Sequence, residues 1–149
     1  MLACNNYAAY LFLAYIGSIL TTSGFQAGCH PPRFFTKLGF SFNAQFTDKT
    51  ATCMVVSEDI FVMLLTEAKF KEFTPNAICD ATKSTEVLVC LSSESREEVD
   101  KMIRKAVAAG GTTYNEPQDH GFMYGHSFQD LDGHIWETMF MEPSAVNQG

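Results

Sequence analysis

Glu137 is a single carboxylate among apolar residues, in a segment with the length and composition of a β-strand. Residues 134–141 are rich in aromatic and aliphatic types and follow residues 130–133 (Asp-Leu-Asp-Gly), which readily form a tight turn. Side chains alternate across a strand, so Glu137 shares a face with Ile135 and Met139. A carboxylate on a buried apolar face is costly unless a metal ion or a hydrogen-bond donor meets it. Glu137 is therefore a candidate for chemistry, and the alternative is a glutamate at a sheet edge that points into solvent.

The clearest predicted helix precedes this hairpin. Ser95 and Glu98 have the spacing of a capping box, in which the two side chains satisfy free backbone N–H groups of the first turn. Gly110 follows the last periodic residue and ends the helix. The pattern predicts an amphipathic helix between Ser95 and Gly110. Its apolar face is formed by Val99, Met102, Ile103, Ala106 and Val107.

Strands are predicted on both sides of this helix, where β-branched and apolar residues gather between turn signals. They cover residues 41–43, 50–56, 60–65, 85–91 and 112–114. In the strand over 85–91, Glu86 and Cys90 lie on the same face. In the last strand, Trp136 and Phe140 lie on the face opposite Glu137, and we expect them to pack under a helix rather than line a cavity.

The order of elements is repeated within the chain. A short helix over residues 33–38, opened by Pro32 and ended by Gly39, leads into strands up to residue 65 in the same order as the longer helix leads into residues 112–141. The simplest architecture is α+β, with two βαβββ modules in one domain over residues 1–149. Residues 1–32 form an atypical N-terminal segment, residues 33–82 the rest of the first module, and residues 83–143 the second. On this alignment Val62 occupies the place of Glu137.

Composition excludes several function classes. The net charge of −7, with no Lys/Arg cluster, argues against nucleic acid as a partner. Five cysteines without a Cys-x-x-Cys pair indicate reduced thiols in a cytoplasmic protein rather than disulfides or a structural zinc site. The apolar run over residues 7–20 has 14 residues, too few for an ordinary membrane span of about 20, so no membrane partner is expected. This run is also the only good candidate for the first strand of the first module.

Two segments resemble one known superfamily. Residues 34–40 (Phe-Phe-Thr-Lys-Leu-Gly-Phe) and 130–137 (Asp-Leu-Asp-Gly-His-Ile-Trp-Glu) look like the vicinal oxygen chelate superfamily, which contains glyoxalase I, bleomycin-resistance proteins and extradiol dioxygenases. The small members labelled lactoylglutathione-lyase-like are the nearest in pattern. The resemblance implies curved mixed sheets around a cavity, and pairing of two chains into a homodimer.

The resemblance also implies a metal site. Metal-dependent members hold a divalent ion (Zn, Ni, Mn or Fe), and two of their ligand positions fall on Glu86 and Glu137. The matching position in the first module is Val62, which cannot bind a metal, and the remaining one falls near Thr21, in a stretch that matches nothing in the family pattern. We therefore expect Glu86 and Glu137 to face each other across a hollow, and any metal to be weakly held.

Two functions are compatible with these residues. The first is a metal-dependent lyase/isomerase or dioxygenase acting on a small molecule with vicinal oxygens, with Glu86 and Glu137 as catalytic residues. The second is a metal-free protein that binds or sequesters a small aromatic or cationic molecule, as bleomycin-resistance proteins do. The candidate substrate-binding residues are Tyr124, His126 and Phe128, which alternate along one face of a strand, and His120, which lies in the loop over residues 116–121. A lone histidine is more often a surface or core residue than a ligand.

Overall fold

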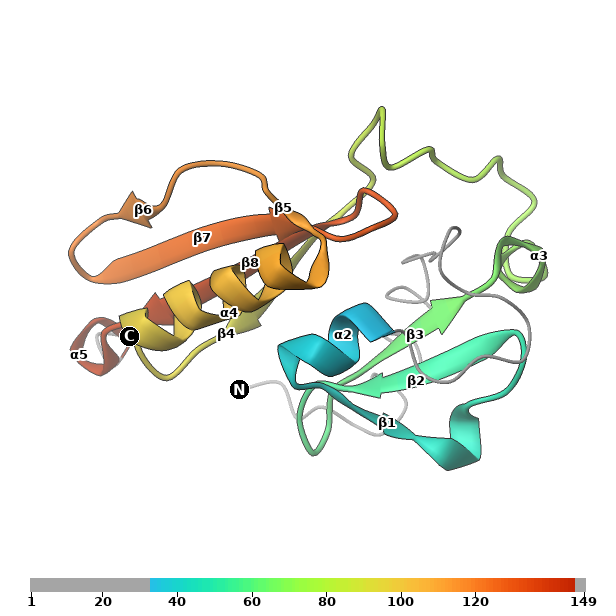
Figure 1. Cartoon of the computed structure of the whole chain (residues 1–149), viewed down its shortest axis with the longest axis horizontal. Helices are drawn as coiled ribbons and strands as arrows, with labels where there is room; N and C mark the ends of the chain where they lie inside the picture. Colours follow the sequence, from blue (N-terminus) through green and yellow to red (C-terminus); the bar gives the residue numbers. More distant parts are fainter. Residues whose placement is uncertain (1–32, 147–149) are drawn as a thin grey trace. The chain divides into compact units, whose positions relative to one another are not determined.

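The computed structural model describes residues 33–146 and divides the chain into two compact units (Figure 1). The division falls between Ile78 and Cys79, four residues before the module boundary predicted at residues 82 and 83. Both units combine helices with open sheets that do not close into barrels, in agreement with the predicted α+β class.

The first unit contains a three-stranded antiparallel sheet in the order β1-β2-β3. Its elements are helix α2 (Arg33–Leu38), strand β1 (Ser41–Asn43), 3-10 helix η1 (Ala44–Phe46), strand β2 (Ala51–Val55), strand β3 (Phe61–Leu65) and helix α3 (Glu67–Phe70). This order confirms the helix and three strands predicted for the rest of the first module. The expected first strand, over residues 7–20, lies outside the described residues.

Apolar residues of α2, β2 and β3 form the buried core of this unit. Phe35 and Leu38 of α2 are fully buried, and Gly39 ends the helix with φ 112°, a conformation that favours glycine. Val62 is 1% exposed in β3. The place that corresponds to Glu137 by the repeat is therefore a core position in the first unit.

The second unit shows the predicted βαβββ order, with one additional short strand. Its elements are β4 (Leu88–Ser92), α4 (Arg96–Ala109), β5 (Thr112–Thr113), β6 (Gln118–Asp119), β7 (Met123–Gln129), β8 (Ile135–Met141) and α5 (Pro143–Val146). Strand β6 lies inside the segment over residues 116–121, where the sequence predicts a loop. The sheet order is β4-β8-β7-β5, with β6 also paired to β7, and only the β4–β8 pair is parallel.

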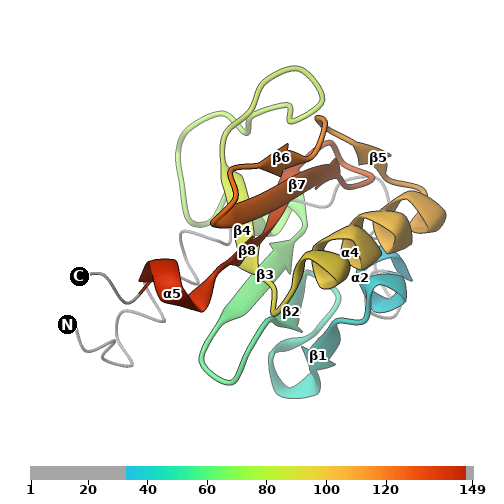
Figure 2. The same cartoon turned by 90° about the vertical axis from the view of Figure 1, so that its left-hand side faces the viewer.

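Helix α4 covers one face of this sheet, along β7 and β8 (Figures 1 and 2). The Ser95 side chain accepts from the Glu98 N–H group at the N-terminus, and Gly110 ends the helix with φ 111°, as predicted. Its buried face is narrower than the predicted stripe: it consists of Val99, Ile103 and Ala106, while Val107 is 47% exposed. A helix lying on a single sheet buries only a narrow strip of its surface, which explains the difference.

The face of the sheet beneath α4 carries the even-numbered residues of the hairpin. The hydroxyl of Tyr124 donates to Asp100 of α4 at 2.8 Å, which identifies this face. Trp136 is fully buried on the same face and stacks on Phe128, with ring centroids 6.3 Å apart. The prediction that Trp136 packs under a helix is confirmed. Because neighbouring side chains alternate, the opposite face carries the odd-numbered residues, Glu137 among them.

Asp130 organises the turn between β7 and β8. Its carboxylate accepts hydrogen bonds from the backbone N–H groups of Asp132 and His134 and from the indole N–H of Trp136, at 2.9–3.0 Å. Burial raises the pKa of Asp130, although the neighbouring His134 side chain and these hydrogen bonds act in the opposite direction. Gly133 takes φ 93°, as the turn sequence predicts. The hydrogen bonds to the buried Asp130 carboxylate therefore hold the turn in one conformation, and this conformation sets the register of the hairpin.

Among the helices of residues 33–146, none has both the length and the apolar content needed to cross a bilayer.

Candidate ligand site

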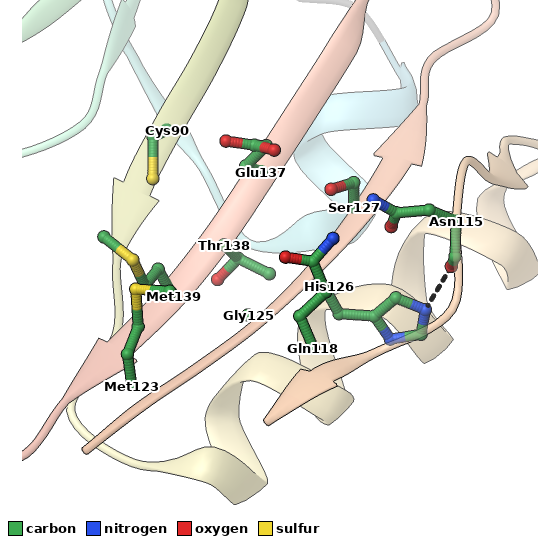
Figure 3. Close-up of a pocket in the computed structure, with 10 residues that line it drawn as sticks. All are labelled: Cys90, Asn115, Gln118, Met123, Gly125, His126, Ser127, Glu137, Thr138 and Met139. Carbon is green, nitrogen blue, oxygen red and sulfur yellow. Dashed lines mark hydrogen bonds between the residues drawn. The ribbon is translucent and has the colours of Figure 1, made fainter. Parts of the chain in front are cut away.

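A small pocket lies over the odd-numbered residues of the second unit's sheet and reaches the edge of β7 (Figure 3). Its volume is about 70 Å³. It is lined by Cys90, Asn115, Gln118, Met123, Gly125, His126, Ser127, Glu137, Thr138 and Met139. Pockets for drug-sized ligands usually measure about 300–1,000 Å³, so this one has room for a small molecule or for one end of a larger one.

Glu137 stands in the middle of a row of three side chains that crosses three strands. In the register of the sheet, Glu137 is paired with Cys90 on β4 and with Ser127 on β7. Paired residues on neighbouring strands have side chains about 5 Å apart and on the same face. Next to this row, Gly125 is paired with Met139, and the missing side chain of Gly125 leaves space above the sheet.

Three polar groups in the pocket lack a partner among residues 33–146. The carboxylate of Glu137 is partly buried and makes no hydrogen bond or ion pair with them. Ser127 is 2% exposed, and its hydroxyl also makes no hydrogen bond there. The side-chain oxygen of Asn115 is buried without a partner. Buried polar groups in proteins are nearly always hydrogen-bonded, so this concentration points to a ligand that completes them.

The end of the pocket near β4 is formed by sulfur-containing side chains. Met123, Met139 and Cys90 lie together there (Figure 3). Although Cys90 keeps an exposed surface, partial burial of its thiol raises the pKa, and the negative charge of Glu137 raises it further. The thiol therefore stays protonated near neutral pH. The pocket thus has an apolar end and a polar end, with Glu137 between them.

His126 contributes to the pocket wall by holding the neighbouring loop. Its Nε2 lies 3.0 Å from the backbone oxygen of Asn115 (Figure 3). A carbonyl oxygen can only accept, so Nε2 carries a proton and donates. This imidazole nitrogen is committed to the loop between β5 and β6, which leaves it unavailable as a metal ligand.

The other residues predicted to contact a substrate lie away from the pocket lining. Phe128 is fully buried against Trp136, and Tyr124 points toward α4, where its ring also lies 5.2 Å from the guanidinium of Arg96. His120 is exposed in the turn between β6 and β7. Of the four predicted substrate-binding residues, the structure places only His126 at the pocket. Tyr124 and Phe128 lie on the face that α4 covers. His126 shares that face by alternation, but its ring lies at the edge of β7 against the backbone of Asn115, where it lines the pocket.

Glu86 does not approach Glu137, and this expectation of a facing pair is corrected. The Oε1 atom of Glu86 lies 2.5 Å from Nδ1 of His134, and the Glu86 side chain is 18% exposed. Strand β4 begins at Leu88, three residues later than predicted, and Cys90 occupies the position beside Glu137. Glu86 is four residues before Cys90, which corresponds to about 13 Å along a strand. The two carboxylates therefore cannot share one metal ion or repel each other at close range.

The side chains of the second unit's pocket do not by themselves form a metal centre. Within residues 33–146, no group of three His, Cys, Asp or Glu side chains could hold a metal ion. Among the described residues that line the pocket, Glu137 is the only carboxylate, Cys90 stays a thiol, and His126 donates to the backbone. The family position near Thr21 lies outside the described residues.

Sequence reasoning missed Asn115, Ser127 and the two methionines of the pocket. The predicted turn would not have found Ser127, because a turn over residues 130–133 pairs residue 127 with residue 136. The observed hairpin pairs Gln129 with Ile135, and this register brings Ser127 opposite Glu137. Asn115 carried no signal either. Its place beside the pocket depends on the pairing of β5 and β6 with β7, and these strands have only two residues each.

Comparisons with known proteins agree with this fold. A sequence model of the Glyoxalase/Bleomycin resistance protein/Dioxygenase superfamily matches residues 33–138. The described fold, two units of helices and open sheets, is that of this class. The chain belongs to the glyoxalase/bleomycin resistance protein/dioxygenase superfamily.

Solved structures share this fold at low sequence identity. The chain is similar to the hypothetical protein SA1046 from S. aureus, with a TM-score of 0.66 and 24% identity, over 82% of this chain and 88% of that one. It is also similar to a glyoxalase-related enzyme from Fulvimarina pelagi (TM-score 0.63, 19% identity, 82% and 86% covered). A third similar structure is a glyoxalase/bleomycin resistance protein/dioxygenase family enzyme from Burkholderia phytofirmans PsJN. Its TM-score is 0.62 at 15% identity, over 83% of this chain and 94% of that one. A comparison with curated proteins gives no match.

Proposed function

We propose that this protein binds a small cationic molecule in the pocket of its second unit, with Glu137 as the counter-charge. The observation that carries the proposal is the partly buried carboxylate of Glu137, which has no partner among residues 33–146. Removing a carboxylate from water costs free energy that a partner normally recovers. A ligand cation placed between Glu137 and the methionine sulfurs would recover it. This is binding or sequestration of the bleomycin-resistance type.

The shape and lining of the pocket support a small ligand group. A volume of about 70 Å³ suits a compact group, such as a quaternary ammonium or a guanidinium, better than a drug-sized molecule. Met123 and Met139 offer polarizable apolar contacts that adapt to the carbon part of such a group. The pocket thus combines one charge with an adaptable apolar wall.

A metal-dependent enzyme is the second candidate. Glu137 occupies a ligand position of the family pattern, and its carboxylate is available to a cation. A bound divalent ion (Zn, Ni, Mn or Fe) would polarise the vicinal oxygens of a substrate in a lyase/isomerase or dioxygenase reaction. Because Glu86 binds His134 instead, this function needs ligands from outside residues 33–146, and we expect any metal to be weakly held.

The cellular setting is part of the same proposal. The free cysteines of the described residues suit a reducing compartment, so we place the protein in the cytoplasm. Pairing into a homodimer, as in related small members of the superfamily, is expected to show as twice the chain mass in light scattering. A small molecule is the expected partner in either function.

Metal analysis and cation titration together separate the two candidates. The full chain is purified without chelator and analysed for bound metal. Tetramethylammonium and methylguanidinium are then titrated while the methyl signals of Met123 and Met139 are followed by NMR with 13C-methyl-methionine. Uncharged tert-butanol, also with five heavy atoms, serves as the control ligand.

Binding of the cations but not of tert-butanol, lost in Glu137→Gln and retained in Glu58→Gln, is the expected result. Glu58 is an exposed glutamate of the turn between β2 and β3, so its substitution matches the charge change without touching the pocket. Stoichiometric metal that is lost in Glu137→Ala would instead favour the enzyme. Equal shifts with tert-butanol and the cations would exclude a charge-based site.

A further inference from the structure

We infer that Asn115 selects, among the cations that the pocket admits, those that carry an N–H or O–H donor. The inference deepens the proposed cation-binding function and rests on it. Its basis is the side-chain oxygen of Asn115, a residue of the pocket lining: this oxygen is buried and accepts no hydrogen bond from residues 33–146.

An unpartnered buried acceptor gives a binding site its preference. Leaving such an oxygen unpaired is unfavourable, whereas a donor on the ligand restores the hydrogen bond that burial took away. A cation whose charge is covered by methyl groups satisfies Glu137 but leaves Asn115 unpaired. A cation with N–H groups can satisfy both. The site therefore discriminates by donor as well as by charge.

The loop that carries Asn115 is held to β7 on both sides, so its side chain cannot easily turn to solvent. The preceding residue, Tyr114, donates its backbone N–H to the oxygen of Ser127 at 3.1 Å. The backbone oxygen of Asn115 accepts from His126 at 3.0 Å. On the far side, Gln118 is paired with Gly125. An acceptor fixed before the ligand arrives costs little ordering entropy on binding.

The carboxylate of Glu137 and the side-chain oxygen of Asn115 lie at different places in the pocket. In the view of Figure 3, Ser127 lies between Glu137 and the Asn115 amide. Glu137 comes from the central strand β8, and Asn115 comes from the loop beyond the edge of β7. Charge and donor recognition therefore come from different elements of the fold and can be removed one at a time.

Two cations of equal size and charge test the inference. Methylguanidinium and tetramethylammonium each have five heavy atoms and one positive charge, and only the first has N–H donors. Both are titrated into wild type and Asn115→Leu, again followed by the methionine methyl signals. The readout is the change in the ratio of the two Kd values, because the difference in hydration between the cations is common to both proteins.

We expect Asn115→Leu to shift this ratio about tenfold against methylguanidinium, which is the value of roughly one hydrogen bond. Binding of tetramethylammonium should persist. Asn115→Asp keeps an acceptor oxygen and adds a negative charge, so both cations should bind more tightly and the preference for methylguanidinium should persist or increase. This variant maintains the test if the leucine variant folds poorly. Asn76→Leu, at an exposed position of the first unit, is the matched control and should leave the ratio unchanged.

The possible failures are distinguishable. If both cations bind and the ratio is the same in Asn115→Leu and wild type, the role of Asn115 is overturned while the proposed function stands. If neither cation binds to wild type, the cation-binding function is overturned and the role of Asn115 with it.

Discussion

The Oε1 atom of Glu86 lies 2.5 Å from Nδ1 of His134, and this contact joins the segment before β4 to the turn between β7 and β8. His134 is 4% exposed, and its backbone N–H donates to the carboxylate of Asp130. Glu86 is thereby held in the structural network of the hairpin. A residue that family resemblance offers as a metal ligand has a different partner in this chain.

The first prediction concerns the stability supplied by this contact. Glu86→Gln should lower the free energy of unfolding by about 2 kcal/mol, because a hydrogen bond to a charged group contributes about 1.5–3 kcal/mol. Urea unfolding followed by the fluorescence of Trp136, the single tryptophan, measures the change. Glu58→Gln is the control and should be neutral. Glu86→Gln should leave the Kd for tetramethylammonium unchanged. A large increase of that Kd would instead show that Glu86 contributes to cation binding.

The second prediction concerns Gly133 in the hairpin turn. A Cβ atom at this position would lie 2.9 Å from the backbone nitrogen of Thr82, and the residue has φ 93°. Gly133→Ala should therefore cost about 3 kcal/mol, from the positive φ and from the displacement of the neighbouring backbone. Gly121 has φ 79° and open space around its Cβ position, so Gly121→Ala should cost only about 1 kcal/mol. An equal loss of unfolding free energy for the two variants in the same urea assay would show that the backbone of residues 81–82 can move away without cost.

The third prediction concerns the acidity of Cys90. Its pKa is raised by partial burial and by the charge of Glu137, so the thiolate fraction at pH 8 is below that of an ordinary cysteine. Replacing Glu137 by Gln removes the second cause, and the pKa should fall. Alkylation of Cys90 by iodoacetamide, followed by mass spectrometry of its peptide, should become faster in Glu137→Gln at pH 8.

Cys79 provides the internal control for this experiment. Burial and the nearby Glu86, not Glu137, raise its pKa, so its alkylation rate should be the same in both proteins. A slower reaction of Cys90 in Glu137→Gln would mean that the two side chains do not interact through charge.

The fourth prediction treats His126 as a positioning residue. His126→Leu removes the donor to the Asn115 backbone and should reduce the preference for methylguanidinium over tetramethylammonium. His126→Gln retains an N–H donor of similar reach and should restore the preference. A purely structural role would change both Kd values equally in both variants. The ratio of the Kd values therefore distinguishes positioning from general loosening of the fold.

Local patterns determined much of the second unit. Three features follow from contacts between residues close in sequence. They are the helix between Ser95 and Gly110, the turn over residues 130–133, and the placement of Glu137 and Trp136 on opposite faces of the sheet. Capping, turn chemistry and strand alternation operate over such short ranges, so they can be recognised in the chain alone. The family assignment has the same origin, because its two motifs are continuous segments.

Only the tertiary structure decided the composition of the site. The parallel register of β4 against β8 places Cys90, and not Glu86, beside Glu137. The pairing of two-residue strands with β7 brings Asn115 to the pocket, where its side-chain oxygen has no partner among residues 33–146. Parallel registers and pairings between distant short strands are set by the packing of the whole sheet, and residue types along one strand do not specify them. The sequence by itself therefore determined which segments form the described fold and marked Glu137 as a candidate, while packing determined which side chains surround it.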